Sequence, residues 1–242
     1  NDGRRGGLTA FYGAPGDNRP AAGIDQEGHA HRAQRFNLPR LHRAAGQLRM
    51  KYDFDITIIG AGSAGMTAAE VAAEMGVRVA LVERDRIGGD CLWTGCVPSK
   101  ALLASAKAAH TVRHAESHGL KASGLAVDTT AVWERLKSIQ NDIAATDDSP
   151  DRYGSMGVEV ISGEARFAGD HQIRVGDRKI RTRFALVCTG SRPAALPIEG
   201  LAETGYLSSE NVFELDRAPE SLIILGGGPI GVEMAQAMIH SR

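Results

Sequence analysis

The sequence predicts an α/β protein, in which a doubly wound domain with a small antiparallel β-meander is followed by the start of a second doubly wound domain. Two glycine-rich segments support this prediction, because each follows a short apolar run and precedes a helical pattern: residues 60–65 and 226–231. Between them lie two of the three cysteines, Cys91 and Cys96. The chain has 242 residues, 43% of them hydrophobic, which is enough to bury one good core or two small ones.

The first glycine segment opens a βαβ unit. The apolar, β-branched run 55–59 predicts a buried strand. The following Gly60-Ala61-Gly62-Ser63-Ala64-Gly65 has the G-x-G-x-x-G spacing. In that pattern the first glycine allows a tight turn, the second lets a pyrophosphate approach the backbone, and the third lets helix and strand pack closely.

The rest of this unit also fits a dinucleotide site. An alanine-rich helix is predicted over 64–75, with Gly76 as its stop and an N-terminus that favours phosphate. A second strand over 77–83 ends at Glu83, about 20 residues past the glycines, where a carboxylate holds a ribose hydroxyl. Strand, helix, second strand and terminal acid together argue against a mere glycine-rich turn.

The second glycine segment repeats the pattern. A strand is predicted over 221–225, and Gly226, Gly228 and Gly231 satisfy the same spacing. Pro229 is tolerated because the first N–H groups of a helix lack helical partners. The sequence ends at Arg242, before a second strand of this unit. Two dinucleotide sites with a dithiol between them indicate electron transfer from a nicotinamide, through a flavin, to a disulfide.

The cysteine pair has a geometric requirement. In a regular α-helix, residues five apart have Cα atoms about 8.6 Å apart, whereas a disulfide needs less than about 7 Å. Cys91 and Cys96 can therefore bond only where the backbone departs from a helix. The glycines at 88, 89 and 95 supply that freedom, and we expect Asp90 to cap the helix that follows.

Three alternatives to a redox pair remain for these cysteines. C-x4-C is a permitted zinc spacing, although no second Cys/His pair at ligand spacing follows. Two inert buried thiols and a structural disulfide are the others. The dinucleotide motif upstream favours the redox interpretation.

From about residue 50 to residue 242 the chain resembles the N-terminal half of a class I pyridine nucleotide–disulfide oxidoreductase, a family that includes dihydrolipoamide dehydrogenase, glutathione reductase and mercuric reductase. The segment from Gly88 to Lys100, GGDCLWTGCVPSK, carries most of this resemblance. By resemblance, Cys91 is the interchange thiol that meets the substrate and Cys96 is the charge-transfer thiol. Lys100 and Glu233 match the pair beside the flavin N5.

The resemblance also implies the cofactor sites. The residues that would bind FAD are Gly60, Gly62, Ser63, Gly65, Glu83, Gly89, Thr189 and Gly190, and those that would begin the NAD(P)H site are Gly226, Gly228 and Gly231. Cys188 stands where the family usually has Ala. Asp90, in a position where Thr is usual, should raise the pKa of the adjacent Cys91 thiol.

The implied function is an FAD-dependent oxidoreductase, similar to mercuric reductase or dihydrolipoamide dehydrogenase. It would move electrons between NAD(P)H and a small or protein-bound thiol or disulfide, or thiol-bound Hg(II). The family's His–Glu acid/base pair comes from a later domain of a homodimer partner, so it maps to no residue here. The rivals are a truncated FAD-binding fragment without turnover, which is what we expect of the 242 residues alone, and a metal-binding module.

Three segments are predicted: a disordered extension over 1–49, an FAD-binding domain over 50–217, and the start of an NAD(P)-binding domain over 218–242. The extension has eight Arg, no Lys, eight Gly and three Pro, a composition that supports no core; an RNA-binding tail is its sharper alternative. Net charge −1 indicates neither nucleic acid nor an anionic membrane as partner. Three cysteines fit a reducing compartment, the cytoplasm, and no apolar run approaches the roughly 20 residues that span a bilayer.

The remaining patterns place the other elements. A helix over 97–118 carries His110, His114 and His118 in one stripe, and three ligands in line cannot surround a metal ion, so no metal site is predicted. A second helix over 131–145 has an expected core face. Its members are Val132, Leu136, Ile139 and Ile143. Segments 158–161, 172–175 and 179–181 predict the meander, and 184–188 predicts a return to the parallel sheet.

Overall fold

The computed structural model describes residues 23–24, 30–31 and 51–240. The chain divides into two units, Asn1–Ala45 and Gly46–Arg242. In the first unit, β1 (Gly23–Ile24) pairs antiparallel with β2 (Ala30–His31); the rest of the predicted extension lies outside the described residues. Among the helices described, none is both long enough and apolar enough to cross a membrane.

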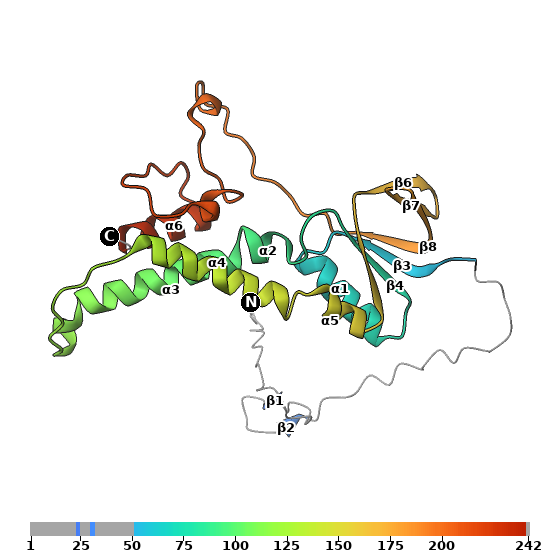
Figure 1. The fold of residues 1–242 in the computed structure, drawn as a ribbon, viewed down its shortest axis with the longest axis horizontal. Coiled ribbons are helices and arrows are strands. Elements are labelled where there is room, and N and C mark those ends of the chain that lie inside the picture. Colours follow the sequence, from blue (N-terminus) through green and yellow to red (C-terminus); the bar gives the residue numbers. More distant parts are fainter. Residues whose placement is uncertain (1–22, 25–29, 32–50, 241–242) are drawn as a thin grey trace, which may run out of the picture. The chain divides into compact units, whose positions relative to one another are not determined.

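The second unit is built on a six-stranded sheet in the order β5-β4-β3-β8-β7-β6 (Figure 1). Its strands are β3 (Phe54–Ile59), β4 (Val79–Glu83), β5 (Val158–Ser162), β6 (Ala165–Gly169), β7 (Gln172–Val175) and β8 (Arg178–Val187). Strands β5, β4, β3 and β8 are parallel, whereas β8, β7 and β6 pair antiparallel. The predicted doubly wound domain with a meander is confirmed.

Burial on both faces explains the apolar run in β4. Val79 and Leu81 join one core cluster, and Ala80 and Val82 join another, because successive side chains of a strand point to opposite faces. The first cluster lies under helices α1 (Ser63–Glu74) and α5 (Pro150–Ser155). The second is closed by residues of the meander.

The strands differ from the prediction in three ways. The segment from Val158 belongs to the parallel part, where β5 pairs with β4, and is not part of the meander. Strand β6 was not predicted. Strand β8 is one continuous strand of ten residues. Its first half pairs with β7 of the meander, and its second half pairs with β3 of the parallel sheet.

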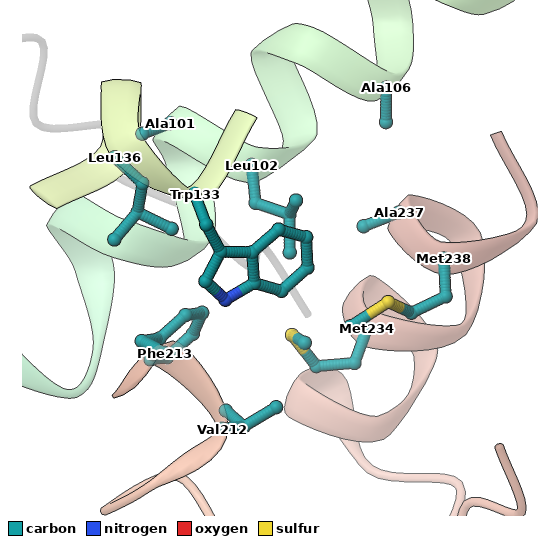
Figure 2. Close-up of a cluster of buried hydrophobic side chains, with 10 residues drawn as sticks. All are labelled: Ala101, Leu102, Ala106, Trp133, Leu136, Val212, Phe213, Met234, Ala237 and Met238. Carbon is teal, nitrogen blue, oxygen red and sulfur yellow. The ribbon is translucent and has the colours of Figure 1, made fainter. Parts of the chain in front are cut away.

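Four helical segments form a separate core. Helices α3 (Cys96–Arg113), α4 (Thr129–Ala145) and α6 (Pro229–His240) and the 3-10 turn Val212–Glu214 surround the fully buried Trp133 (Figure 2). Its neighbours include Leu102, Leu136 and Phe213. This cluster joins α6, from the second glycine unit, to the helix that begins at Cys96.

The helices also correct parts of the prediction. The helix predicted over 97–118 ends at Arg113, and a 3-10 turn, Ala115–His118, runs on to Gly119. Helix α4 buries Trp133, Leu136 and Gln140. Of the predicted face, Leu136 is buried, and Val132 and Ile139 are partly buried against the same core. The α4 N-terminus is capped by Asp128, whose carboxylate accepts from the N–H groups of Thr130 and Ala131.

The strand predicted over 221–225 is not formed: the segment pairs with no strand of the described chain. Ile223 is 87% exposed. A strand is defined by hydrogen bonds to a neighbour, so apolar β-branched composition alone does not create one.

Candidate functional site

The first glycine segment lines a cavity of about 920 Å³ at the carboxyl ends of β3, β4 and β8. Such edges of doubly wound sheets are where nucleotides bind. The cavity is lined by eight of the predicted site residues, Gly60, Gly62, Ser63, Glu83, Gly89, Cys91, Thr189 and Gly190. Arg84, Arg86 and Arg192 also line it, together with six acidic residues. The glycine backbone and the helix N-terminus in this lining suit a diphosphate.

Steric contacts account for the glycine spacing. A Cβ at Gly65 would collide with the carbonyl oxygen of Gly60, so only glycine allows α1 to leave β3 at this angle. The second segment repeats the contact, since a Cβ at Gly231 would collide with the carbonyl oxygen of Gly226. Both predicted fingerprints thus form the same turn. At Gly226 and Gly228, by contrast, an added Cβ would meet no atom within 4 Å.

Glu83 is held at the end of β4 by two backbone donors. Its Oε2 accepts from Ala61 N–H at 2.6 Å, and its Oε1 accepts from Asp85 N–H at 2.9 Å. Each carboxylate oxygen keeps a second lone pair. The carboxylate is therefore fixed at the cavity wall and can still accept a hydrogen bond from a hydroxyl there. These features together fit FAD.

The backbone breaks between the two cysteines. Helix α2 (Gly89–Trp93) contains Cys91, and Cys96 is the first residue of α3. Gly95 lies at the break, and a Cβ there would approach the carbonyl oxygen of Asp90 to 2.8 Å. The predicted departure from a helix between the cysteines is confirmed. Both thiols are free in the structure, with Cys91 half-buried and Cys96 exposed.

Asp90 does not act as predicted. It lies in the first turn of α2, and the N-caps of α2 and α3 are Gly88 and Gly95, without a side-chain hydrogen bond. The pKa of the Cys91 thiol is raised, but burial is the main cause and the contact with Cys96 is the second. The carboxylate that contributes is Asp148, while a hydrogen bond with Ser63 acts in the opposite direction.

Lys100 and Glu233 meet across 133 positions of sequence. The ammonium Nζ lies 2.6 Å from Oε1 and 2.7 Å from Oε2 of the carboxylate. The pair joins the fifth residues of α3 and α6, and it is not buried: the side chains are 59% and 37% exposed. Its energy is therefore that of an exposed ion pair.

Several predicted site residues lie outside the large cavity: Gly65, Cys96, Lys100, Glu233, Gly226, Gly228 and Gly231. The three histidines do not form a line of ligands either. His110 instead stacks on His114 and on His240 of α6, with ring centroids 4.0 and 4.4 Å apart. Within the described ranges no group of three or more ligating side chains is placed to hold a metal ion.

Sequence reasoning missed two residues near Cys91. Gln140, buried on α4, donates its amide N–H groups to the carbonyls of Leu92 and Trp93, both at 2.9 Å, and so holds the end of α2. Asp148 lies in the turn after α4 and lines a second, smaller cavity with Cys91. Neither had a sequence signal, since a lone amide or acid at the end of a helix is ordinary.

Comparisons with known proteins agree with this geometry. A model of the pyridine nucleotide-disulphide oxidoreductases matches residues 54–241. The chain is 37% identical over 197 residues to a mercuric reductase of Streptomyces lividans (78% of this chain, 41% of that protein). It is 32% identical over 204 residues to a dihydrolipoyl dehydrogenase of Bacillus subtilis (79% and 42%).

Among solved structures, the chain is similar to the HOCl-induced flavoprotein disulfide reductase RclA from Escherichia coli. The TM-score is 0.65 at 29% identity, and the match covers 78% of this chain and 40% of that one. The chain thus spans less than half the length of these relatives. The family consists of FAD-binding, NAD(P)H-dependent enzymes. Since the family model covers most of the sequence, the chain belongs to the pyridine nucleotide-disulphide oxidoreductases.

Proposed function

We propose that the chain is the flavin-binding part of an enzyme that moves electrons between NAD(P)H and a substrate through Cys91 and Cys96. The observation that carries this is the break between α2 and α3, which lets two cysteines five positions apart approach each other beside the large cavity. In this proposal residues 50–217 are the FAD-binding domain and 218–242 begin the NAD(P)-binding domain.

The cavity residues named above would hold FAD, which when bound supplies two-electron transfer between a nicotinamide and a disulfide. Cys91, between the two cavities, would be the thiol that meets the substrate. Cys96 would be the charge-transfer thiol of the pair, as the resemblance implies. The ion pair of Lys100 and Glu233 would hold α3 and α6 together next to Cys96.

The proposed substrates are disulfides, dithiols or a thiol-bound metal ion. Mercuric reductase and dihydrolipoyl dehydrogenase among the relatives support Hg(II) and a dithiol, respectively. Attack of the Cys91 thiolate on a substrate disulfide forms a mixed disulfide and releases one substrate thiol. Attack of Cys96 then releases the second and leaves the Cys91–Cys96 disulfide. We place this enzyme in the cytoplasm, as a homodimer.

A count of thiols tests this proposal. The FAD-loaded protein, oxidised and then reduced anaerobically, should show two more titratable thiols after reduction. Cys96→Ser should abolish the difference, and the matched control Cys188→Ser should keep it. An equal thiol count before and after reduction would exclude a redox pair. Assays of the longer enzyme with lipoamide, oxidised glutathione and Hg(II) then identify the acceptor.

A second candidate function is flavin binding without turnover by the 242-residue polypeptide itself. The exposed, unpaired segment before α6 favours it, because nucleotide-binding domains hold that segment as a strand. Steady-state oxidation of NAD(P)H by this polypeptide, within tenfold of a typical rate of about 10 s⁻¹, would reject this candidate.

A further inference from the structure

Cys91 lies between two cavities of different size. On one side is the large cavity of about 920 Å³, which the glycine segment lines. On the other side is a cavity of about 230 Å³, enclosed by parts of α1, α2 and α5 and the turn before α5. Cys91 and Ser63 line both. A substrate that reaches Cys91 while FAD fills the first cavity approaches through the second.

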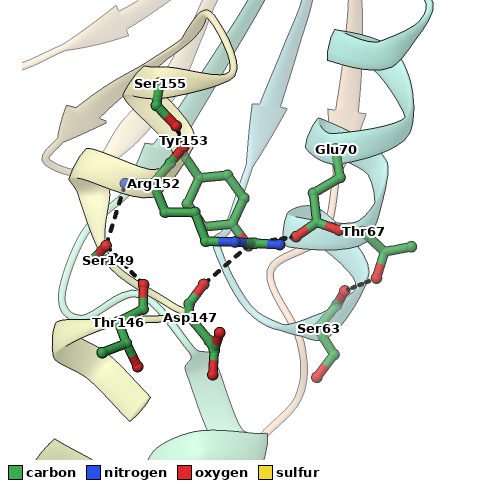
Figure 3. A network of polar contacts seen from close by, with 9 residues as sticks. All are labelled: Ser63, Thr67, Glu70, Thr146, Asp147, Ser149, Arg152, Tyr153 and Ser155. Carbon is green, nitrogen blue, oxygen red and sulfur yellow. Dashed lines mark hydrogen bonds and ion pairs between the residues drawn. The ribbon is translucent and has the colours of Figure 1, made fainter. Parts of the chain in front are cut away.

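The second cavity carries two carboxylates, of which one is neutralised. Glu70 accepts from Arg152 Nη1 at 2.6 Å and from the hydroxyl of Tyr153 at 3.1 Å (Figure 3). Arg152 also donates to the carbonyl oxygen of Asp147 at 3.1 Å. The positive charge of Arg152 is therefore paired with Glu70, which leaves Asp148 as the other acid of the cavity.

Asp148 is the carboxylate left without such a partner. Among the described residues, its side chain makes no hydrogen bond or ion pair. Burial is the main reason that the pKa of its carboxyl is raised, the charges of Asp147 and Glu70 act in the same direction, and the charge of Arg152 opposes them. The Asp148 Oδ2 would lie 3.1 Å from a Cβ at Gly88, so the carboxylate rests against the backbone three positions before Cys91. The charge of Asp148 also acts directly on the Cys91 thiol, whose pKa it raises, after the larger effects of burial and Cys96.

We propose that Asp148 determines substrate charge at Cys91, so that this thiol selects neutral or cationic thiol-reactive substrates over anionic ones. This inference rests on the proposed function, in which Cys91 meets the substrate. A half-buried carboxylate in a narrow cavity attracts cations and repels anions more strongly than the same charge in open water. An acidic disulfide would carry its negative charge into the field of Asp148, whereas a cation would be drawn in.

Two thiol reagents of opposite charge test the selection. Trimethylammonioethyl and sulfonatoethyl methanethiosulfonate both react by attack of a thiolate on the sulfenyl sulfur, which forms a mixed disulfide and releases methanesulfinate. The ratio of their rates cancels the thiolate fraction, so a change in the pKa of Cys91 does not disturb it. Rates with 2-mercaptoethanol normalise the intrinsic reactivity of each reagent.

The measurement uses the FAD-loaded protein carrying Cys96→Ser, so that the mixed disulfide on Cys91 is not resolved, with Cys91 labelling read by mass spectrometry. At low ionic strength the cation should react about tenfold faster than the anion after normalisation. Asp148→Asn should lower that ratio by about threefold or more. Asp142→Asn is the matched control: it removes the same charge from an exposed position of α4, outside the cavity, and should leave the ratio unchanged.

The outcomes separate this inference from the function on which it rests. Labelling of Cys91 by neither reagent overturns both. Equal normalised rates, or a ratio that Asp148→Asn leaves unchanged, overturn the charge selection and leave the redox proposal standing. If Asp148→Asn does not fold, the same ratio is measured at increasing salt concentration in the protein that keeps Asp148. The ratio should fall toward one as salt screens the carboxylate. A ratio that does not change with salt overturns the inference.

Discussion

At the scale of single residues, Cys91 is set apart from the other cysteines by its surroundings. Burial raises the pKa of its thiol, and contacts with Cys96 and the charge of Asp148 raise it further. Only the hydrogen bond with Ser63 opposes them. The thiolate is the reactive form, so each neighbour that is removed should change the rate at which Cys91 reacts.

Replacing Cys96 by alanine should lower the pKa of the Cys91 thiol, because it removes the second-largest cause of its elevation. Alkylation of Cys91 by iodoacetamide at a fixed pH near 7.5 should then be faster. The pH profile of the alkylation rate, read on the Cys91 peptide, measures this. Cys188→Ala is the control and should not move the profile; a profile unchanged by Cys96→Ala would contradict the contact.

The Lys100–Glu233 pair should contribute little to stability on its own. Disrupting a buried ion pair costs about 3–5 kcal/mol, but both of these side chains are partly exposed. A double-mutant cycle with Lys100→Met and Glu233→Gln should give a coupling energy of about 0.2–1 kcal/mol. Urea unfolding measures it, and Lys51→Met is the unpaired control. A coupling energy above about 3 kcal/mol would show that the pair behaves as a buried one.

At the scale of elements, α2 is a short helix that depends on neighbours. Its five residues cannot be stable alone. Its end is held by Gln140, and the indole N–H of Trp93 donates to the carbonyl of Ile87 at 2.8 Å, with Arg86 stacked 4.1 Å above the Trp93 ring. The position of Cys91 thus depends on a side chain of α4.

Gln140→Leu should destabilise the protein by about 1–3 kcal/mol, because it leaves two buried carbonyl groups without a donor. The same change should alter the reactivity of Cys91, since α2 loses the contact that fixes its end. Denaturant unfolding and alkylation of Cys91 measure the two effects. Asn141→Leu, the exposed next residue, should do neither. Equal losses from both changes would show that Gln140 has no special role.

Acid should weaken the packing of α3 against α6. Burial lowers the pKa of His110, and His114, His240 and Arg113 act in the same direction. Its Nδ1 is covered and has no partner among the described residues. The unfolded chain therefore takes up a proton first as pH falls, so stability is lost from about pH 6.5 downward. His110→Gln should flatten the slope of stability against pH between about 5 and 7, while His118→Gln should not.

The elements also show what local patterns can and cannot predict. The βαβ unit from Phe54 to Glu83 was predicted to within two residues at each end, because its alternation, glycines and stop signals are local. Strand β6 was missed and β5 was assigned to the wrong part of the sheet, because strand pairing depends on distant partners. The break before Cys96 followed from glycine chemistry, but the roles of Gln140 and Asp148 arise only when α4 folds against α2.

At the scale of the whole molecule, exposed apolar surface sets the expected behaviour of the 242-residue polypeptide. In the described chain, the second half of β8 has β3 on one side and no strand on the other, and Phe184 and Val187 are exposed. Ile223 and Leu225, in the unpaired segment before α6, are exposed as well. Unpaired apolar edges favour association between chains.

We therefore predict that the 242-residue polypeptide holds FAD weakly and associates as its concentration rises. Light scattering and the ratio of flavin to protein measure the two properties. Val187→Lys should reduce association because a charge on an open edge opposes pairing. The exposed Leu120→Lys, away from the sheet, is the control and should leave association unchanged. A monodisperse polypeptide with full flavin content would contradict the prediction.

The continuity of β8 has a mechanical consequence. The strand starts in the meander, is joined to the residue before β3 by the Arg181–Asp53 ion pair, and leads into Cys188, Thr189 and Gly190 at the cavity wall. An extended β-strand stretches little, so a shift at one end moves the other end by a similar amount. We therefore expect the meander to set how far the end of β8 reaches toward the cavity. A change in the meander that touches no ligand would alter flavin affinity through the length of this one strand.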